Sequence, residues 1–503
     1  MAFLLGGANS ATGGYNIDNS LRFYSAAEEK LEDTGLGTAT STKIGTLSVW
    51  CKLSGYTIGG ASTNHGSILS SRVDDNNYLY LKHQDYGDTG KLYMKGYLSG
   101  SQNVLLETTR VLRDPSAWYH IVVAWDTTDS TEANRMKIYV NNEQITSWTQ
   151  DTFPAEDALI RFNSSDRYIG VRRDNGTGNY YSGYMADYNI VDGLQLTPSN
   201  FAEADEDSGI WKPKEPDVSE YGTNGIFLEF KESGTSQNAS GMGADTSGKG
   251  NHLAVTNLDA TSVVTDSPTN NFCTMIPASN IKLSEGNLKG VTTRTMYWDA
   301  VRGSIGVTSG KWYFEMKASL SDDTFRVIGG FVGDPENLGV AFDGKGLSGD
   351  PLDHINQTST PFYGKGVWLS HWYAQDGNDA STASTQSSGD ILQFALDLDN
   401  YKLYIGVGGT FYDNDNSADG DPAAGSNPSV TIPSAAYTGR TFFPAFWLRD
   451  DDDADDNVAE MNFGNPPFAI SSGNADANGY GNFEYAVPSG YYALCTKNLA
   501  EFG

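Results

Sequence analysis

One aromatic cluster in the second half of the chain has the side chains best suited to contact a ligand. Trp368, His371, Trp372 and Tyr373 occur within six residues. Aromatic rings pack against the apolar C–H face of a sugar, and the polar stretch 376–388 that follows is typical of an exposed loop. In a strand, however, Trp368 and Trp372 would point the same way and could be buried together. The cluster therefore predicts a ligand-binding site, with a buried strand as the competing interpretation.

Carboxylates suited to a hard cation gather in two later segments, 413–421 and 450–456. The second segment has aspartate at six of its seven positions. Calcium prefers oxygen ligands, but Ser426 stands where an EF-hand loop counted from Asp415 would need its glutamate. Each segment therefore has two possible interpretations, a calcium site or a solvated acidic loop. The candidate calcium ligands are Asp413, Asp415, Asp419, Asp421, Asp451 and Asp453.

The composition argues against several classes of protein. The chain has 503 residues and a formal net charge of −30, from 63 acidic and 33 basic residues. Such a surface repels nucleic-acid backbones and anionic membranes, so we expect neither as a partner. Three widely spaced cysteines do not suggest a disulfide framework, and we expect them to be buried as small apolar residues. No apolar run approaches the length of a membrane span.

The N-terminal segment 1–19 begins with a short apolar stretch. No basic residue precedes Phe3, Leu4 and Leu5, so the segment is not expected to act as a secretion signal. We expect the chain to stay in the cytoplasm in which it is made, or to be assembled there into a larger structure that leaves the cell. The three apolar side chains are suited to docking into another protein, and a frayed or core-tucked terminus is the alternative.

Sequence patterns typical of β-strands dominate the chain, so strands must position the candidate site residues. Short runs alternate apolar and polar side chains, and Gly, Asn, Asp and Ser separate them. Hairpins are predicted at Asn141-Asn142 and after Asp397, and a short helix is predicted to begin at Thr197. The pattern predicts an all-β chain of two antiparallel β-sandwiches with little helix. The expected strands are 47–53, 78–82, 91–97, 119–125, 136–140, 168–171, 312–318, 328–331, 391–396, 403–407, 442–447 and 458–463.

Proline-punctuated and polar stretches predict the domain boundaries. Residues 210–217 contain two prolines, and 266–271 form a second polar edge. Each of the two predicted hairpins falls in a different half of the chain. We therefore expect four parts: an N-terminal docking segment at 1–19, a sandwich at 20–213, a connector with short strands at 214–274, and a second sandwich at 275–503.

Four motifs in the first half follow one another in a recognisable order. They are WYHIVVAW at 118–125, KIYVNN at 137–142, YIGV at 168–171 and YSGYMADY at 181–188. As a set they resemble the laminin-G-like jelly rolls of the concanavalin A type. The resemblance implies a jelly-roll sandwich, and it leaves open whether this domain binds a ligand or only packs.

The last 220 residues resemble the SPRY-type sandwich through GKWYFE at 310–315, GDILQFALDLD at 389–399 and FPAF at 443–446. Residues 1–10, 267–272 and 484–497 are similar to virion proteins of marine bacteriophages. The combined resemblance implies a virion surface protein, a tail fibre or related appendage, assembled in the host cytoplasm. It also implies docking of the N-terminus into other virion proteins and a homo-oligomer, most simply a trimer.

The same resemblance implies adsorption to a host-surface glycan or protein. A structural decoration of capsid or tail and a depolymerase of capsular polysaccharide are the alternatives. Glycosidases that resemble the β-glucanases carry Glu-x-Asp-x-x-Glu on one strand, and none of the expected strands contains this motif; its one occurrence, from Glu215 to Glu220, lies outside them. The motifs Gly-x-Ser-x-Gly and His-Glu-x-x-His are missing from the sequence. We therefore expect binding without bond-breaking, no enzyme activity, and calcium as the one candidate cofactor.

Overall fold

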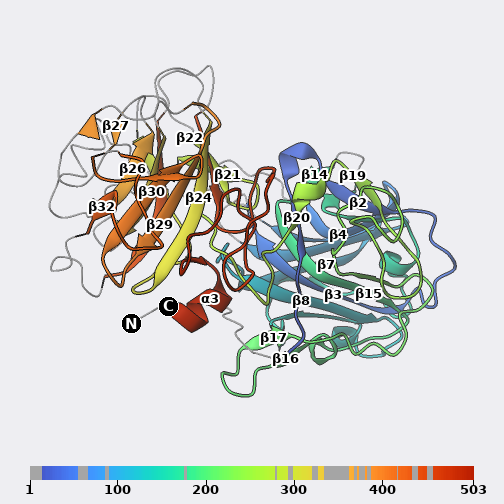
Figure 1. Ribbon diagram of the computed structural model, residues 1–503. Coiled ribbons are helices and arrows are strands. Elements are labelled where there is room, and N and C mark those ends of the chain that lie inside the picture. Colours follow the sequence, from blue (N-terminus) through green and yellow to red (C-terminus); the bar gives the residue numbers. More distant parts are fainter. Residues whose placement is uncertain are drawn as a thin grey trace. The chain divides into compact units, whose positions relative to one another are not determined.

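The computed structural model is almost entirely β within the residues that it describes (Figure 1). It divides into two units, with the division between Asn271 and Phe272. In the described part of the chain, no helix is long and apolar enough to cross a bilayer. The described residues are 14–54, 66–84, 90–174, 178–277, 280–292, 298–319, 327–333, 362–367, 371–372, 380–381, 387–415, 417–432, 440–449 and 457–503.

Unit 1 contains two eight-stranded antiparallel sheets. The first sheet consists of β1 (Ser20–Phe23), β3 (Ile44–Leu53), β8 (Trp118–Asp126), β9 (Met136–Val140), β10 (Glu143–Gln144), β15 (Gly183–Asp192), β18 (Ile226–Leu228) and β20 (Val263–Val264). Its order is β10-β9-β8-β3-β15-β1-β20, with β18 paired to β15. The second sheet consists of β2 (Lys30–Asp33), β4 (Ser67–Asp74), β5 (Asn77–Gln84), β6 (Lys91–Leu98), β7 (Ser101–Val111), β11 (Trp148–Thr152), β12 (Arg167–Ile169) and β19 (Ala254–Thr256). Its order is β11-β7-β6-β5-β4-β12-β2-β19.

The two sheets of unit 1 share one core because alternate side chains of their strands are apolar. Leu47 and Val49 of β3 lie in the same buried cluster as Leu79 and Leu81 of β5. Two sheets that bury their inner faces in this way form a β-sandwich. Shorter pairs lie outside the two sheets: β13 (Val171–Arg172) with β14 (Asn179–Tyr180), and β16 (Ala202–Ala204) with β17 (Trp211–Pro213).

Residues 214–271 lie within unit 1, although we expected 214–274 to connect two sandwiches. Strand β18 pairs with β15, β19 pairs with β2, and β20 pairs with β1. Strands of two or three residues cannot satisfy their backbone groups alone, so they complete the edges and flanks of existing sheets.

Unit 2 also has two main sheets. The larger has nine strands: β21 (Ile281–Ser284), β22 (Lys289–Thr292), β24 (Lys311–Ser319), β29 (Ile391–Asp397), β30 (Lys402–Val407), β31 (Thr410–Tyr412), β32 (Val430–Thr431), β34 (Val458–Asn462) and β35 (Tyr492–Ala493). The smaller has β23 (Trp298–Arg302), β33 (Phe442–Arg449), β25 (Val327–Gly333) and β26 (Phe362–Val367), in that order. All pairs in these sheets are antiparallel except β24 with β35.

Phe314 of β24 and Phe446 of β33 belong to one buried cluster, so the two sheets of unit 2 also share a core. The prediction of an all-β chain built from antiparallel sandwiches is confirmed. Helical structure in the described residues is limited to α3 (Thr496–Phe502) and short 3-10 turns at Ser25–Ala27, Glu132–Asn134, Arg161–Asn163, Pro198–Asn200 and Ala260–Ser262. The helix predicted at Thr197 is one of these turns, with Thr197 in a capping box.

Both predicted hairpins are present. Asn141 and Asn142 join β9 to β10 with φ values of 48° and 69°, the left-handed conformation that tight hairpins need. Between β29 and β30 the left-handed residue is Tyr401, with φ of 54°, and Asn400 instead donates to Asp397. The turn residues therefore predicted both hairpins correctly, although the residue with a positive φ in the second hairpin is a tyrosine.

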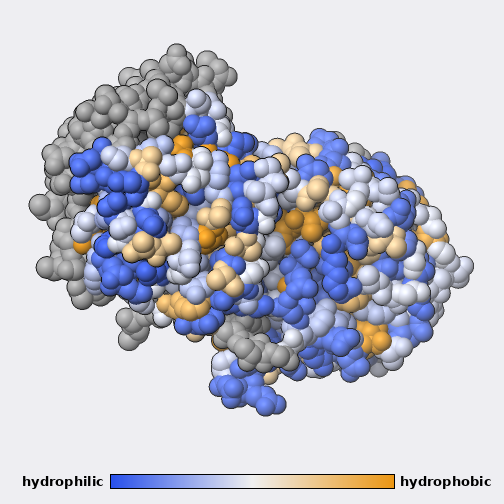
Figure 2. All heavy atoms as spheres, viewed as in Figure 1, coloured by the Kyte–Doolittle hydropathy of each residue, from blue (hydrophilic) through white to orange (hydrophobic). Residues whose placement is uncertain are grey.

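Hydrophilic residues cover much of the visible face, and hydrophobic residues occur there in small patches (Figure 2). Val73 and Leu159 are the exposed large hydrophobic residues of the described part of the chain. The surface is thus consistent with the strongly acidic composition.

Candidate functional site: a tyrosine face on unit 1

The aromatic cluster singled out in the sequence falls largely outside the described residues. His371 and Trp372 form the short strand β27 (His371–Trp372), which pairs with β28 (Ala380–Ser381). Trp368 and Tyr373 lie outside the described residues, as do Asp451, Asp453, Phe3, Leu4 and Leu5. The aromatic site, the second acidic segment and the docking segment therefore stay predictions.

The first acidic segment, 413–421, is described except for residue 416, and two of its carboxylates accept hydrogen bonds from nearby backbone N–H groups. Asp413 Oδ1 accepts a hydrogen bond from Ser417 N at 2.6 Å, and Asp421 Oδ1 accepts one from Ala424 N at 2.9 Å. Asp415, Asp419 and Asp421 are exposed. Across the described ranges, no group of three or more His, Cys, Asp or Glu side chains is arranged to hold a metal ion.

A different set of aromatic residues gathers on the second sheet of unit 1, where β5 and β6 lie side by side. Leu79 and Leu81 of β5 and Leu92 and Met94 of β6 point into the core. Because side chains alternate along a strand, the residues between them point away from it. We call this outward set the tyrosine face, and its members are Tyr78, Tyr80, Lys82, Tyr93, Lys95 and Tyr97, together with Arg172 of β13.

The four tyrosine rings form a continuous stack. Tyr78 and Tyr97 are paired across the two strands, and their ring centroids are 5.1 Å apart at an interplanar angle of 26°. Tyr80 lies 6.2 Å from Tyr78 and 6.2 Å from Tyr93, with angles of 9° and 27°. Tyr80 is 4% exposed, and the other three rings are half-buried. Burial raises the pKa of Tyr78 to about 12, so its hydroxyl stays protonated near neutral pH.

Cationic groups lie over three of these rings. The distances to the ring centroids are 5.6 Å for Arg172 Cζ over Tyr80, 5.5 Å for Lys82 Nζ over Tyr93, and 5.3 Å for Lys95 Nζ over Tyr97. Burial and, to a smaller extent, the nearby charge of Arg172 together lower the pKa of Lys82 to about 8. The face thus combines apolar ring surfaces, hydroxyl groups and positive charge on a strongly acidic protein.

Two carboxylates border the tyrosine face, and both are in ion pairs. Glu107 Oε1 lies 2.9 Å from Lys91 Nζ, and Glu107 Oε2 accepts from Gln150 Nε2 at 3.2 Å. Asp174 Oδ2 lies 3.3 Å from Arg172 Nε. Carboxylates held in this way neutralise part of the positive charge and fix the positions of the cations.

A separate hollow of about 270 Å³ in unit 2 bears on the depolymerase alternative. It is lined by Asp390 and Glu484 together with Tyr485, Phe468 and Lys317. A general acid of a glycosidase needs a raised pKa. Hydrogen bonds from Ser471 instead lower the pKa of Glu484, which suits a structural acceptor.

Sequence reasoning predicted β5 and β6 as strands but overlooked the tyrosine face. The signal was present as tyrosine at alternate positions, Tyr78 and Tyr80 on one strand and Tyr93 and Tyr97 on the next. Alternation shows that the rings of one strand share a face. The register that brings Tyr78 opposite Tyr97 requires the structure.

The comparisons with known proteins agree with the fold of unit 1. Residues 20–200 match the family Laminin_G_3, described as the concanavalin A-like lectin/glucanases superfamily. This part of the chain therefore forms a concanavalin A-like domain, as the sequence motifs suggested. No curated protein matches the chain.

Several solved structures are similar to parts of the chain. A heptameric SAP-like pentraxin from Limulus polyphemus is 18% identical, with a TM-score of 0.26, and the match covers 36% of this chain and 78% of the pentraxin. The SPRY domain of human HERC1 is 11% identical, with a TM-score of 0.22 and coverage of 35% and 87%. Domain 4 of the Geobacillus stearothermophilus arabinanase AbnA, solved with arabinotriose, is 18% identical, with a TM-score of 0.22 and coverage of 32% and 65%.

Proposed function

We propose that the tyrosine face binds a polysaccharide, and that the ligand is acidic. The stacked rings of Tyr78, Tyr80, Tyr93 and Tyr97 carry this proposal, because such rings pack against the C–H faces of sugars. Lys82, Lys95 and Arg172 are placed to pair with carboxylate or sulfate groups along the ligand. The match of residues 20–200 to a superfamily of lectins and glucanases supports the same class of ligand.

We further propose that this binding serves adsorption of a phage virion to its host. Support comes from the resemblance of residues 1–10, 267–272 and 484–497 to phage virion proteins. In this proposal the chain is a tail fibre or related surface appendage, and Phe3, Leu4 and Leu5 dock it into the particle. The chain acts as a homo-oligomer, a trimer by analogy with phage fibres.

The proposal assigns binding without bond-breaking to this chain. On the tyrosine face, Glu107 and Asp174 are each in an ion pair, so neither is poised as an uncommitted acid or base. A depolymerase would cleave a polysaccharide that the chain binds, and a purely structural decoration would bind none. Size analysis of the bound polysaccharide after long incubation separates these possibilities.

Adsorption of particles tests the biological role. Antibody to this chain should label the surface of intact phage particles, and purified chain should block their adsorption to host cells. Tyr93→Ala should lose this blocking activity, whereas Tyr139→Ala, which changes a half-buried tyrosine of the other sheet of unit 1, should keep it. Trp372→Ala tests the aromatic cluster of unit 2 in the same assay. Unlabelled particles would refute the virion assignment.

A further inference from the structure

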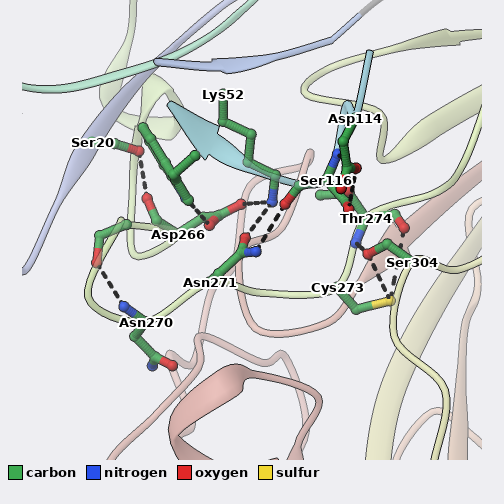
Figure 3. Close-up of polar contacts among 12 residues, drawn as sticks. Ser20, Lys52, Asp114, Ser116, Asp266, Asn270, Asn271, Cys273, Thr274 and Ser304 are labelled. Atoms are coloured by element: carbon green, nitrogen blue, oxygen red, sulfur yellow. Dashed lines mark hydrogen bonds and ion pairs between the residues drawn. The ribbon is translucent and has the colours of Figure 1, made fainter. Parts of the chain in front are cut away.

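Lys52, Asp266 and Asn271 form a buried polar cluster in unit 1. The Lys52 Nζ atom lies 2.7 Å from Asp266 Oδ2 and 2.7 Å from Asn271 Oδ1 (Figure 3). The side chains of Lys52 and Asp266 are completely buried, and Asn271 is 7% exposed. An amine, a carboxylate and a carboxamide are therefore in contact and shielded from bulk water.

Neighbouring groups hold the carboxylate and the carboxamide in this orientation. Asp266 Oδ1 accepts a hydrogen bond from Trp118 Nε1 at 3.2 Å. Asn271 Nδ2 donates to the backbone oxygen of Ser116 at 2.8 Å, which directs the Oδ1 atom toward Lys52 (Figure 3). The carbon that carries Oδ1 is one C=O bond, about 1.2 Å, from that oxygen. The Lys52 amine is thus held beside the amide group of Asn271.

Aromatic rings complete the surroundings of the amine. The ring centroid of Tyr184 lies 5.6 Å from Lys52 Nζ, and Tyr184 is completely buried. Trp118 is 8% exposed. A buried ion pair has lost the solvation of both charges, and transfer of one proton from the lysine to the aspartate removes that penalty. The same transfer converts the ammonium group into a nucleophile.

We propose that Lys52 and Asn271 form an intramolecular amide bond between their side chains, with Asp266 as the proton carrier. Asp266 takes one proton from the Lys52 ammonium, and the Nζ lone pair attacks Cγ of Asn271. Asp266 donates its proton to the departing amide nitrogen and regains one from Nζ. The Cγ–Nδ2 bond breaks as the Cγ–Nζ bond forms, and ammonia leaves, taking the last proton as ammonium. The reaction is an acyl transfer and needs no oxidant.

The folded chain supplies most of what this reaction requires. The amine and the amide are already in contact, so the entropy of bringing them together is spent during folding. Water, which would compete as a nucleophile and as a solvent for the ammonium group, is excluded by burial. The resulting bond would fasten β3 to the last residue of unit 1 and would persist after the chain unfolds. It is independent of the tyrosine face and of the proposed glycan ligand.

The mass of the purified full-length chain under denaturing conditions tests this proposal. The chain should be lighter than its sequence by the mass of one ammonia molecule. Because cyclisation of an asparagine elsewhere would give the same loss, the bond must be located by tryptic digestion and tandem mass spectrometry. Trypsin does not cleave after an acylated lysine, so a linked pair of peptides 44–72 and 250–282 is expected. Separate peptides ending at Lys52 and containing an unmodified Asn271 would overturn the proposal.

Variants assign the roles of the three residues. Lys52→Arg and Asn271→Ala should each retain the full sequence mass, and Asp266→Asn should form little or none of the linked peptide. Asp33→Asn is the matched control, because Asp33 is also buried in an ion pair, with Arg167, and no bond is expected there. That control should be linked as completely as the wild type. A fully linked Asp266→Asn chain would overturn the role of Asp266, and the wild-type digest decides the bond itself even if a variant fails to fold.

Discussion

The rings of Tyr78 on β5 and Tyr97 on β6 stack with their centroids 5.1 Å apart, directly across the two strands. Each ring is fixed by a strand whose other face is buried in the core of unit 1. A ligand that packs on these rings therefore meets a surface that needs little reorganisation, which favours affinity.

The charge of Lys82 should make binding of an acidic polysaccharide depend on pH. Its pKa is lowered to about 8, so the ammonium group is present below this pH and is lost as the pH rises through it. Binding should weaken between about pH 7 and pH 9. Lys82→Arg should remove this loss, because arginine stays protonated. Titration calorimetry of both proteins provides the comparison, and equal pH dependence in the two would refute the role of Lys82.

His120 should make unit 1 less stable in acid. Its ring stacks on Trp50 at 4.7 Å, its Nδ1 accepts from Trp211 Nε1 at 3.0 Å, and its Nε2 donates to Ser48 Oγ at 2.8 Å. Burial lowers its pKa to about 3. Between that value and its ordinary pKa the unfolded chain binds a proton that the folded chain does not. The free energy of unfolding should therefore fall below about pH 6.5, by at most about 1.4 kcal/mol per pH unit.

Denaturant unfolding at several pH values measures this effect of His120. His120→Gln removes the titrating group and should flatten the decline between pH 6.5 and 4, even if the variant is less stable throughout. An unchanged slope in the variant would assign the acid sensitivity to other groups.

Glu315 should be important for the stability of unit 2. This buried carboxylate accepts hydrogen bonds from Glu484 N, Tyr485 N and Tyr313 Oη at 3.0, 2.8 and 2.9 Å. Glu315→Gln would turn an amide nitrogen toward at least one of these donors and should lower the free energy of unfolding by about 1–3 kcal/mol. Glu501→Gln, at an exposed position of the same unit, should change it by less than about 0.5 kcal/mol. Equal stability of both variants would contradict this prediction.

The three cysteines should be unreactive in the folded protein. Cys51, Cys273 and Cys495 are free thiols with no exposed surface, as the sequence analysis expected. Burial raises the pKa of Cys51 to about 12, which suppresses its thiolate. A thiol reagent should therefore modify none of them in the native protein and all three after denaturation. Rapid modification of the native protein would contradict the described packing.

Local patterns predicted much of the fold. Strand β9 was predicted with its bounds because Met136–Val140 alternates buried and half-buried side chains and ends at an Asn-Asn turn. Strand β4 was overlooked because serine occupies three of its buried positions, Ser67, Ser70 and Ser71. The pairing of the short strands expected in the connector 214–274 could not be predicted either, since β18, β19 and β20 pair with partners far away in the chain.

The sites were harder to predict than the fold for the same reason. A run such as Trp368–Tyr373 attracts attention because its residues are neighbours in sequence. The tyrosine face needs the register between β5 and β6, and the Lys52 cluster joins residues 214 and 219 positions apart. Contacts of this kind are set by sheet pairing, which a single sequence does not specify.

Binding of polysaccharides to a variant that lacks the stacked pair Tyr78 and Tyr97 is the decisive test of the tyrosine face as a ligand-binding surface. Titration calorimetry should compare the wild type, the double variant Tyr78→Leu/Tyr97→Leu and the control Tyr139→Leu against a panel of acidic and neutral polysaccharides. Unfolding curves should confirm that all three proteins are folded. The wild type and the control should bind an acidic polysaccharide equally, and the double variant should bind it at least about tenfold more weakly. Equal affinity of the double variant, or no binding of any acidic polysaccharide by the wild type, would contradict the proposed role of this face.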